Sequence, residues 1–190
     1  MGKVEVAALL LSFIWALAVT RILESLRDLW VARDRVRPSV SQFAWMAAIL
    51  LSVMLSWLNL ALLGDHVRGW VVVGLFAYGL GLYFAAATVS PKTPEAGVID
   101  LAEYETREGA AYKLVNIALM VLALPLDYEL ALVTGRPSTG DFLVSQWSVF
   151  ATLAAYAIGL SNLRWLRTLC AGAAVLLAAY AFARNLGLIF

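Results

Sequence analysis

The sequence contains few side chains suited to nucleophilic catalysis or metal binding. Its 190 residues include one cysteine and one histidine, Cys170 and His66. One cysteine cannot form an internal disulfide, and neither residue has partners at metal-ligand spacing. Short motifs of serine hydrolases, zinc proteases and phosphate-binding loops are also absent from the sequence. We therefore expect no enzyme activity and no resident metal or cofactor.

Charged residues are also scarce. They make up 14% of the chain, against about 25% in soluble proteins, and the net charge is +1. A protein with no excess of basic residues is not expected to bind nucleic acid. Hydrophobic residues reach 63%, and the mean hydropathy is +0.84. A soluble domain of this size would lack the polar residues to cover its surface, so we expect the lipid bilayer as the main partner.

Six apolar stretches are each close to the 20 or so residues that a helix needs to cross a bilayer. They are Val4–Leu23, Phe43–Leu63, Gly69–Val89, Gly109–Val133, Phe142–Leu160 and Trp165–Leu186. The runs are continuous rather than alternating, which favours helices over a membrane barrel. The sequence therefore predicts one all-α domain over residues 1–190 with six transmembrane helices. Three crossings per half would also allow a three-plus-three inverted arrangement.

The fourth stretch is open to two interpretations because it contains Pro125. If the helix ends there, Asp127 and Glu129 lie in water. If the helix reaches Val133, both acids lie in the outer third of the bilayer, where ionisable groups are costly and by default indicate a functional site. Glu5, Asp65 and Asp141 belong to the same side, so an acidic outer vestibule is one hypothesis. Lys113, at the start of this stretch, is expected to extend its ammonium group to water.

The basic residues predict the orientation. One side carries ten of them and the other side four, and the side richer in lysine and arginine faces the cytoplasm. The ten are Arg21, Arg27, Arg33, Arg35, Arg37, Lys92, Arg107, Lys113, Arg164 and Arg167, and the four are Lys3, Arg68, Arg136 and Arg184. Both termini are therefore expected outside, in the periplasm of a bacterium.

The densest charged group in any expected helix consists of Arg21, Glu24, Arg27 and Asp28. Arg21 and Glu24, and likewise Glu24 and Asp28, lie one turn apart and share a face, because helical neighbours are three or four residues apart. The group suits the inner mouth of an ion pathway. Alternatively, it belongs to an amphipathic extension of the first helix at the water boundary, where its charges pair with one another.

Three short segments resemble a group of short bacterial multi-pass membrane proteins of unassigned function. The segments are Thr20-Arg21-Ile22-Leu23-Glu24, Arg33-Asp34-Arg35-Val36-Arg37-Pro38 before a tryptophan-bearing second stretch, and Asp100-Leu101 with Tyr104. The resemblance covers about the first two-thirds of the chain. It implies a location in the bacterial inner membrane and transfers no activity.

Two function classes follow from the sequence. The first is a homo-oligomeric ion channel or small-solute transporter. Its pathway candidates are Asp127, Glu129, Arg21, Glu24 and Asp28, because ionisable residues at membrane depth are usually functional. The alternative is a non-catalytic accessory subunit of a larger membrane complex, respiratory or photosynthetic. That alternative depends on the lack of a concentrated polar site.

Overall fold

The computed structural model describes residues 3–60, 69–92, 97–133, 142–143 and 145–186. Within these ranges the regular structure is almost entirely helical, which confirms the all-α prediction. The six α-helices are α1 (Lys3–Val31), α2 (Val40–Leu60), α3 (Gly69–Val89), α4 (Leu101–Val133), α6 (Trp147–Ile158) and α7 (Arg164–Asn185). A short 3-10 turn, η1 (Arg33–Arg35), and two strands of two residues, β1 (Val36–Arg37) and β2 (Ile99–Asp100), lie in the connections.

Five of the helices in the described part of the chain are long and apolar enough to cross a membrane. The helix α4 settles the question raised by Pro125, because it continues through the proline and runs for 33 residues. The helix α6 is shorter than the expected Phe142–Leu160, with 12 residues and a length of about 18 Å. A separate helical turn precedes it, in which the Gln146 amide donates to the Phe142 carbonyl at 3.1 Å.

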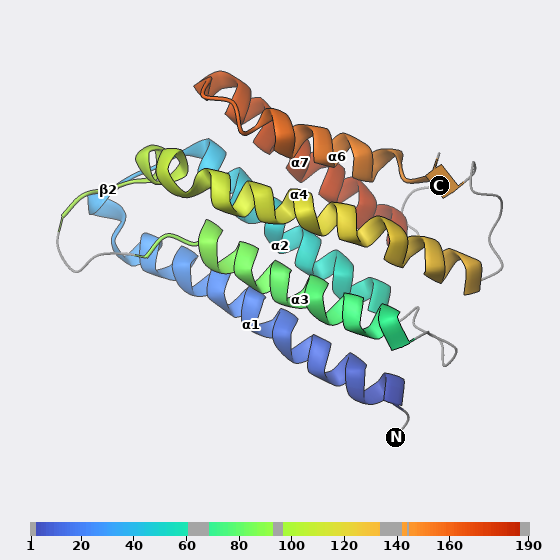
Figure 1. Cartoon of the computed structure of the whole chain (residues 1–190). Helices are drawn as coiled ribbons and strands as arrows, with labels where there is room; N and C mark the ends of the chain where they lie inside the picture. The colour runs from blue at the N-terminus through green and yellow to red at the C-terminus, as the bar shows by residue number, and fades with distance from the viewer. Residues whose placement is uncertain (1–2, 61–68, 93–96, 134–141, 144, 187–190) are drawn as a thin grey trace.

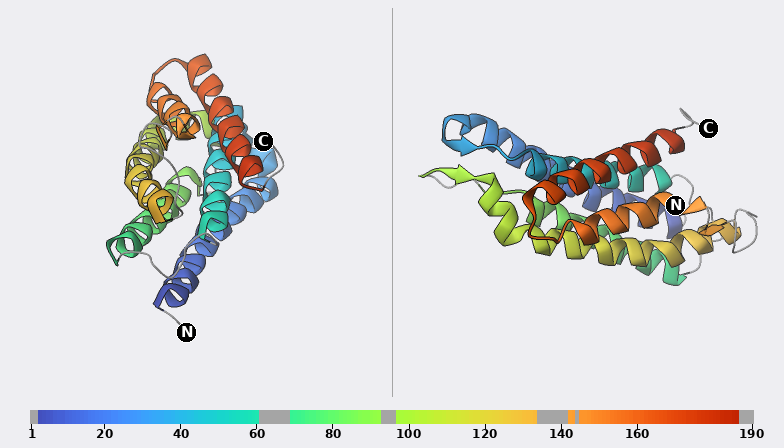
Figure 2. Two further views of the ribbon diagram at one scale, coloured as in Figure 1. Left: turned by 90° about the vertical axis from the view of Figure 1, so that its right-hand side faces the viewer. Right: turned by 90° about the horizontal axis from the view of Figure 1, so that it is seen from above.

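The six helices run roughly along one direction and close into a ring (Figures 1 and 2). Each helix packs on two neighbours in the order α1, α3, α4, α6, α7 and α2, and α2 packs again on α1. The helix α2 also touches α3 and α4 across the ring. The packing pairs differ between the two halves of the chain, so they lend no support to an inverted arrangement, which stays a prediction.

One end of the bundle gathers the arginines of the connections. At this end α1, α3 and α6 finish and α2, α4 and α7 begin (Figure 1). We call it the basic end, after Arg33, Arg35, Arg37, Arg164 and Arg167. The strands β1 and β2 pair here in parallel, with Val36 opposite Ile99 and Arg37 opposite Asp100. Gly97 precedes β2 with a φ of 102°, a backbone conformation that glycine adopts without strain.

The interior of the ring is packed with large apolar side chains. Fully buried examples include Trp15, Ile22, Trp45, Ile49, Leu82 and Tyr112. Other large apolar side chains point outward along the helices, among them Leu9, Phe13, Val73, Phe84 and Leu176. Outward apolar side chains over such lengths suit a lipid environment, because helices satisfy their backbone groups internally and lipid covers the side chains.

Candidate functional site

Polar residues line one face of α4 along most of its length. Glu105, Asn116 and Asp127 are 11 residues apart from one another, which is about three helical turns, and therefore share a face. Lys113 lies at the edge of this face. From Glu105 to Asp127 the helix rises about 33 Å, close to the thickness of the hydrocarbon core. The face points into the ring, because Glu105, Lys113 and Asn116 are buried.

A buried ion pair lies in the part of this face that is nearer to the basic end. Lys113 Nζ lies 3.2 Å from Glu105 Oε1, and the two side chains are 2% and 4% exposed. The same carboxylate oxygen accepts hydrogen bonds from Ser41 Oγ at 3.0 Å and from Trp45 Nε1 at 3.2 Å. Lys113 Nζ also donates to the Gly159 carbonyl at 2.9 Å, where α6 ends. The pair therefore connects α4 to α2 and to the end of α6.

Aromatic rings surround the lysine of this pair. Lys113 Nζ lies 5.0 Å from the ring centroid of Trp45 and 5.6 Å from that of Tyr112, within range of cation–π attraction. Tyr156 packs on Trp45 with a centroid separation of 4.7 Å. Tyr112 donates to Gln42, whose side-chain amide donates to the carbonyl of Val89 at 2.6 Å. Together these side chains fill the ring at this level.

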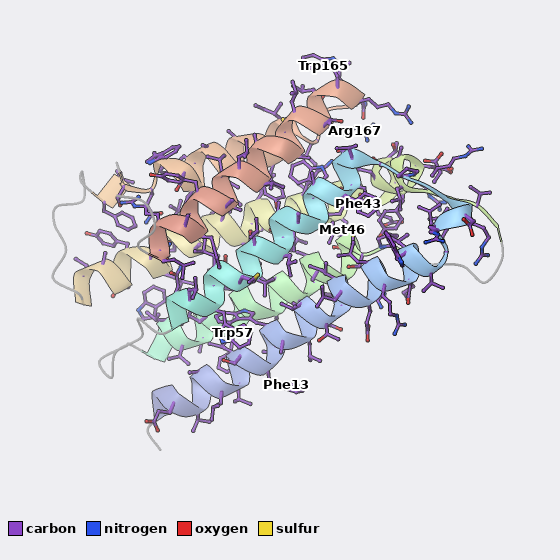
Figure 3. The ribbon with its side chains drawn as sticks, turned by 180° about the vertical axis from the view of Figure 1, so that it is seen from behind. Phe13, Phe43, Met46, Trp57, Trp165 and Arg167 are labelled. Carbon is purple, nitrogen blue, oxygen red and sulfur yellow. The ribbon has the colours of Figure 1, made fainter. Side chains whose placement is uncertain are left out.

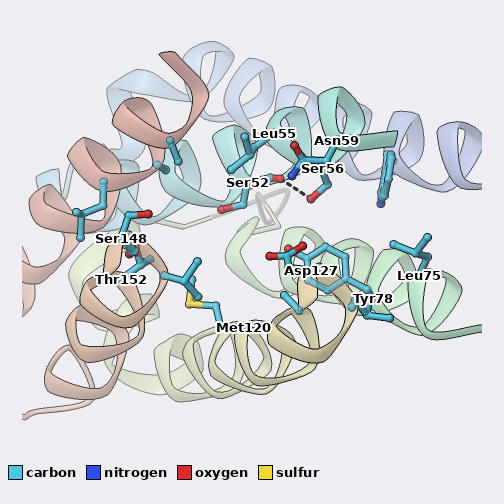
Figure 4. A pocket seen from close by; sticks show the side chains of 17 residues that line it. Ser52, Leu55, Ser56, Asn59, Leu75, Tyr78, Met120, Asp127, Ser148 and Thr152 are labelled. Carbon is cyan, nitrogen blue, oxygen red and sulfur yellow. Dashed lines mark hydrogen bonds between the residues drawn. The ribbon is translucent and has the colours of Figure 1, made fainter. Parts of the chain in front are cut away.

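A cavity of about 150 Å³ lies in the half of the ring farther from the basic end (Figure 4). All six helices contribute to its wall, so it is the central cavity of the ring. Its polar lining residues are Ser52, Ser56, Asn59, Tyr78, Asp127, Ser148 and Thr152.

Asp127 supplies the carboxylate of the central cavity. The side chain is partly buried on α4 and faces Ser56 and Asn59 of α2 (Figure 4). In the described part of the chain, no basic side chain lies within 4.0 Å of it. Tyr78 of α3 also lines the cavity and lies beside Asp127 (Figure 4). Trp15 also lines the cavity, and its buried indole N–H has no hydrogen-bond partner within the described ranges.

Glu129, the other acid predicted in this region, is not among the residues that line the central cavity. Two residues along a helix turn a side chain by about 200°, so Glu129 leaves α4 on the side opposite Asp127. The hypothesis of an acidic outer vestibule also involves Asp65 and Asp141, which lie outside the described residues. The two predicted pathway acids of α4 are therefore separated by the helix itself.

The charged group of α1 lies on the partly exposed side of the helix. Arg21 Nη1 is 3.9 Å from Glu24 Oε2, and Arg27 Nη2 is 2.8 Å from Asp28 Oδ1. Neither pair lines the central cavity or the cavity of the basic end described next. The arrangement matches the interpretation as paired charges at the water boundary. A pathway role for Arg21, Glu24 and Asp28 stays a prediction.

A second cavity, of about 460 Å³, opens at the basic end. The starts of α2, α4 and α7 surround it. Its lining residues include Arg37, Ser41, Asp100, Glu105, Arg164, Trp165, Arg167 and Thr168. Trp165 and Arg167 are in the first turn of α7, at the same end of the bundle as Phe43 in α2 (Figure 3). We call it the basic-end cavity.

Asp100 caps α4 at the rim of the basic-end cavity. Its Oδ1 accepts hydrogen bonds from the amides of Glu103 at 3.1 Å and Ala102 at 3.0 Å, and its Oδ2 lies 3.7 Å from Arg37 Nη1. The Glu103 hydrogen bond is the main reason why the pKa of the Asp100 carboxyl is below its ordinary value, and the Ala102 bond and Arg37 add to the effect.

Sequence reasoning missed the buried pair. The expectation that Lys113 extends to water is wrong, because its side chain is almost fully buried. Glu105 precedes it by eight residues, and only long side chains that run along the helix can meet over that spacing. The sequence contained a signal for this burial. Glu105, Asn116 and Asp127 share one helical face, and Lys113 lies inside an apolar stretch.

Comparisons with known proteins found no relative of this chain. The chain matches no family model, no curated protein and no solved structure. The described residues contain no group of three or more metal-ligating side chains. The functional argument therefore depends on the geometry of this chain alone.

Proposed function

We propose that this protein is a membrane transporter that binds a small hydrated cation in its central cavity. The observation that carries the proposal is one carboxylate, Asp127, in a largely apolar cavity that also contains hydroxyl and amide groups and whose wall includes residues from all six helices. An ionisable side chain at membrane depth is costly and is usually retained for a function. A cation beside Asp127 would offset that cost, because it supplies the opposite charge that the described residues do not.

The hydroxyl groups of the cavity favour a cation over an anion. Ser52, Ser56 and Thr152 each donate their proton to a carbonyl four residues earlier, at 2.9, 2.8 and 2.7 Å. With the protons engaged in their own helices, the hydroxyl oxygens are left to act as acceptors. Oxygen acceptors and a carboxylate are the ligands that hard cations prefer.

The filled level between the two cavities favours a transporter over an open channel. Trp45, Tyr112 and Tyr156 are at most 1% exposed, and the Glu105–Lys113 pair lies among them. A solute in the central cavity could reach the basic end only after these side chains move, as alternating access requires. The cavity lies within one chain, so the proposal requires no pore between subunits.

The charge distribution supports an orientation for this transporter. The basic end would face the cytoplasm, since loops rich in lysine and arginine are retained there. The central cavity would then lie closer to the outer surface, and both termini would be periplasmic in a bacterial inner membrane.

Cation uptake into proteoliposomes tests the proposal. The purified protein would be reconstituted and supplied with gradients of sodium, rubidium or protons, read with radioactive tracers and a pH-sensitive dye. We expect uptake of one of these cations, and a decrease of about tenfold or more in Asp127→Asn, equivalent to about 1.4 kcal/mol. Asp34→Asn is the matched control, because its side chain is 94% exposed in η1 and outside both cavities.

Two results would contradict the proposal. One is the absence of uptake for all three cations by a folded, reconstituted protein. The other is equal uptake by Asp127→Asn and the wild type. Stoichiometric co-purification of other membrane subunits, together with absent uptake, would instead favour the accessory-subunit hypothesis.

A further inference from the structure

We infer that the basic-end cavity binds a phosphate group, either of an anionic phospholipid headgroup or of free phosphate. The inference is independent of the central cavity and of cation transport. It follows from the charges that line the basic-end cavity, their partners, and the helix ends around it.

Arg167 is the central observation. The residue is only 9% exposed, yet it lines the cavity. Its Nη1 lies 3.3 Å from Thr106 Oγ1, while its buried Nε has no hydrogen-bond partner in the part of the chain that the structure describes. Among the described residues, no carboxylate lies within 4.0 Å of its guanidinium group. A buried guanidinium without a paired anion is costly, and an anionic ligand in the cavity would remove that cost.

The acidic residues of the same cavity are already engaged. Glu105 pairs with Lys113 and accepts from Ser41 and Trp45. Asp100 is bound to two backbone amides and lies beside Arg37. Arg164 and Arg167 are thus the two cations of the lining without a carboxylate at ion-pair distance. The local field in the cavity therefore favours an anion.

Helix ends add to this field. The helices α2, α4 and α7 all begin at the cavity, and helix starts carry partial positive charge. No side chain of the described residues caps the start of α7. Its first backbone N–H groups are therefore available to an oxyanion beside Arg164 and Arg167, an arrangement that suits phosphate oxygens.

The position of the cavity suits a headgroup. Trp165 lines it and is 61% exposed, as expected for a tryptophan at the level of the lipid headgroups. Basic pockets between membrane helices on the cytoplasmic side bind anionic lipid headgroups.

Binding of two probes would test the inference and distinguish the sources. The full-length protein in neutral detergent would be titrated with phosphatidylglycerol, with zwitterionic phosphatidylcholine and, separately, with inorganic phosphate. Native mass spectrometry would count bound lipid, and calorimetry would follow phosphate. Arg167→Gln removes the buried charge, and Arg164→Gln removes an exposed one at little risk to folding. Arg33→Gln is the matched control at the same end, because it does not line the cavity.

We expect one binding site that weakens about fivefold or more in Arg164→Gln and Arg167→Gln and is unchanged in Arg33→Gln. Preferential binding of phosphatidylglycerol with this pattern indicates a headgroup, and binding of inorganic phosphate with this pattern indicates free phosphate. The inference is overturned if neither probe binds, if phosphatidylcholine binds as well as phosphatidylglycerol, or if all three variants behave alike. Cation uptake in the same variants would show separately whether transport is affected.

Discussion

Lys113 Nζ lies 3.2 Å from Glu105 Oε1 in the interior of the helix ring, and both side chains are almost fully buried. Burial removes both charges from water, so the pair is stable only because each partner has the other and further hydrogen bonds. Ser41 and Trp45 provide these for Glu105, and the Gly159 carbonyl does so for Lys113. The pair therefore links three helices at one point.

Replacing only the lysine should be more damaging than replacing both members of the pair. Lys113→Met leaves the Glu105 carboxylate buried without a cation, and we expect a loss of about 3 kcal/mol in the free energy of unfolding. The double variant Lys113→Met/Glu105→Gln removes both charges of the pair and should lose less. Denaturant unfolding in detergent, followed by tryptophan fluorescence, measures both losses. Equal losses in the two proteins would show that the charge of Glu105 is not what destabilises the single variant.

The membrane helices could be predicted because each depends on local hydrophobicity. The continuation of α4 through Pro125 could not be predicted, since the sequence allowed the helix either to end at Pro125 or to reach Val133. The short α6 was also missed. Its start follows Ser145 and Gln146, polar residues within an otherwise apolar stretch, and the backbone forms a separate turn before it. A mean hydropathy taken over about 20 residues does not resolve such a short break.

The site was only partly predictable for a different reason. Asp127 was recognised because its depth could be counted along one helix. The partners of Lys113 include Trp45 and Gly159, which lie 68 residues before it and 46 residues after it. Which side chains meet at such separations depends on the ring order of the helices, and hydrophobicity does not encode that order.

Two glycine-to-alanine substitutions should have opposite effects. A Cβ at position 159 would lie 2.9 Å from Trp45 Cζ2 and 3.0 Å from the Ala155 carbonyl, so Gly159→Ala should push α6 away from Trp45. We expect a loss of about 1–3 kcal/mol in stability, as for overpacked cores. A Cβ at position 172 meets nothing within 4 Å, and Gly172→Ala should gain up to about 1 kcal/mol from helix propensity. Thermal unfolding in one detergent compares the two, and a stable Gly159→Ala would contradict the close approach.

The cap of α4 should give the protein a measurable pH dependence. The pKa of Asp100 is below its ordinary value in the folded protein, so its charge stabilises the fold at neutral pH. That contribution is complete above the ordinary pKa, near 4, and is lost as the pH falls through the lowered value. Asp100→Asn can still cap the helix but carries no charge. Melting curves of the two proteins between pH 7 and pH 3 should show a wild-type advantage at neutral pH that disappears in acid. A constant difference across this range would exclude a role for the charge.

Filling the central cavity should impair transport without removing any polar group. Ala123 of α4 lines the cavity, and the space of about 150 Å³ can take the three extra carbons of a leucine. We therefore expect Ala123→Leu to fold with unchanged or slightly higher stability, because filling a void restores packing contacts. Cation uptake should fall about tenfold or more, since the leucine occupies the space assigned to the ion.

Ala118→Leu is the matched control for this variant, because it makes the same change on the exposed face of the same helix. Its uptake should equal that of the wild type, and melting temperatures in the same detergent would show that both variants fold. If Ala123→Leu transports as well as Ala118→Leu, the ion does not pass through the central cavity. A loss of uptake in both variants would point to a general effect of altered α4 packing. Only a loss confined to Ala123→Leu supports the cavity as the binding site, independently of the charge of Asp127.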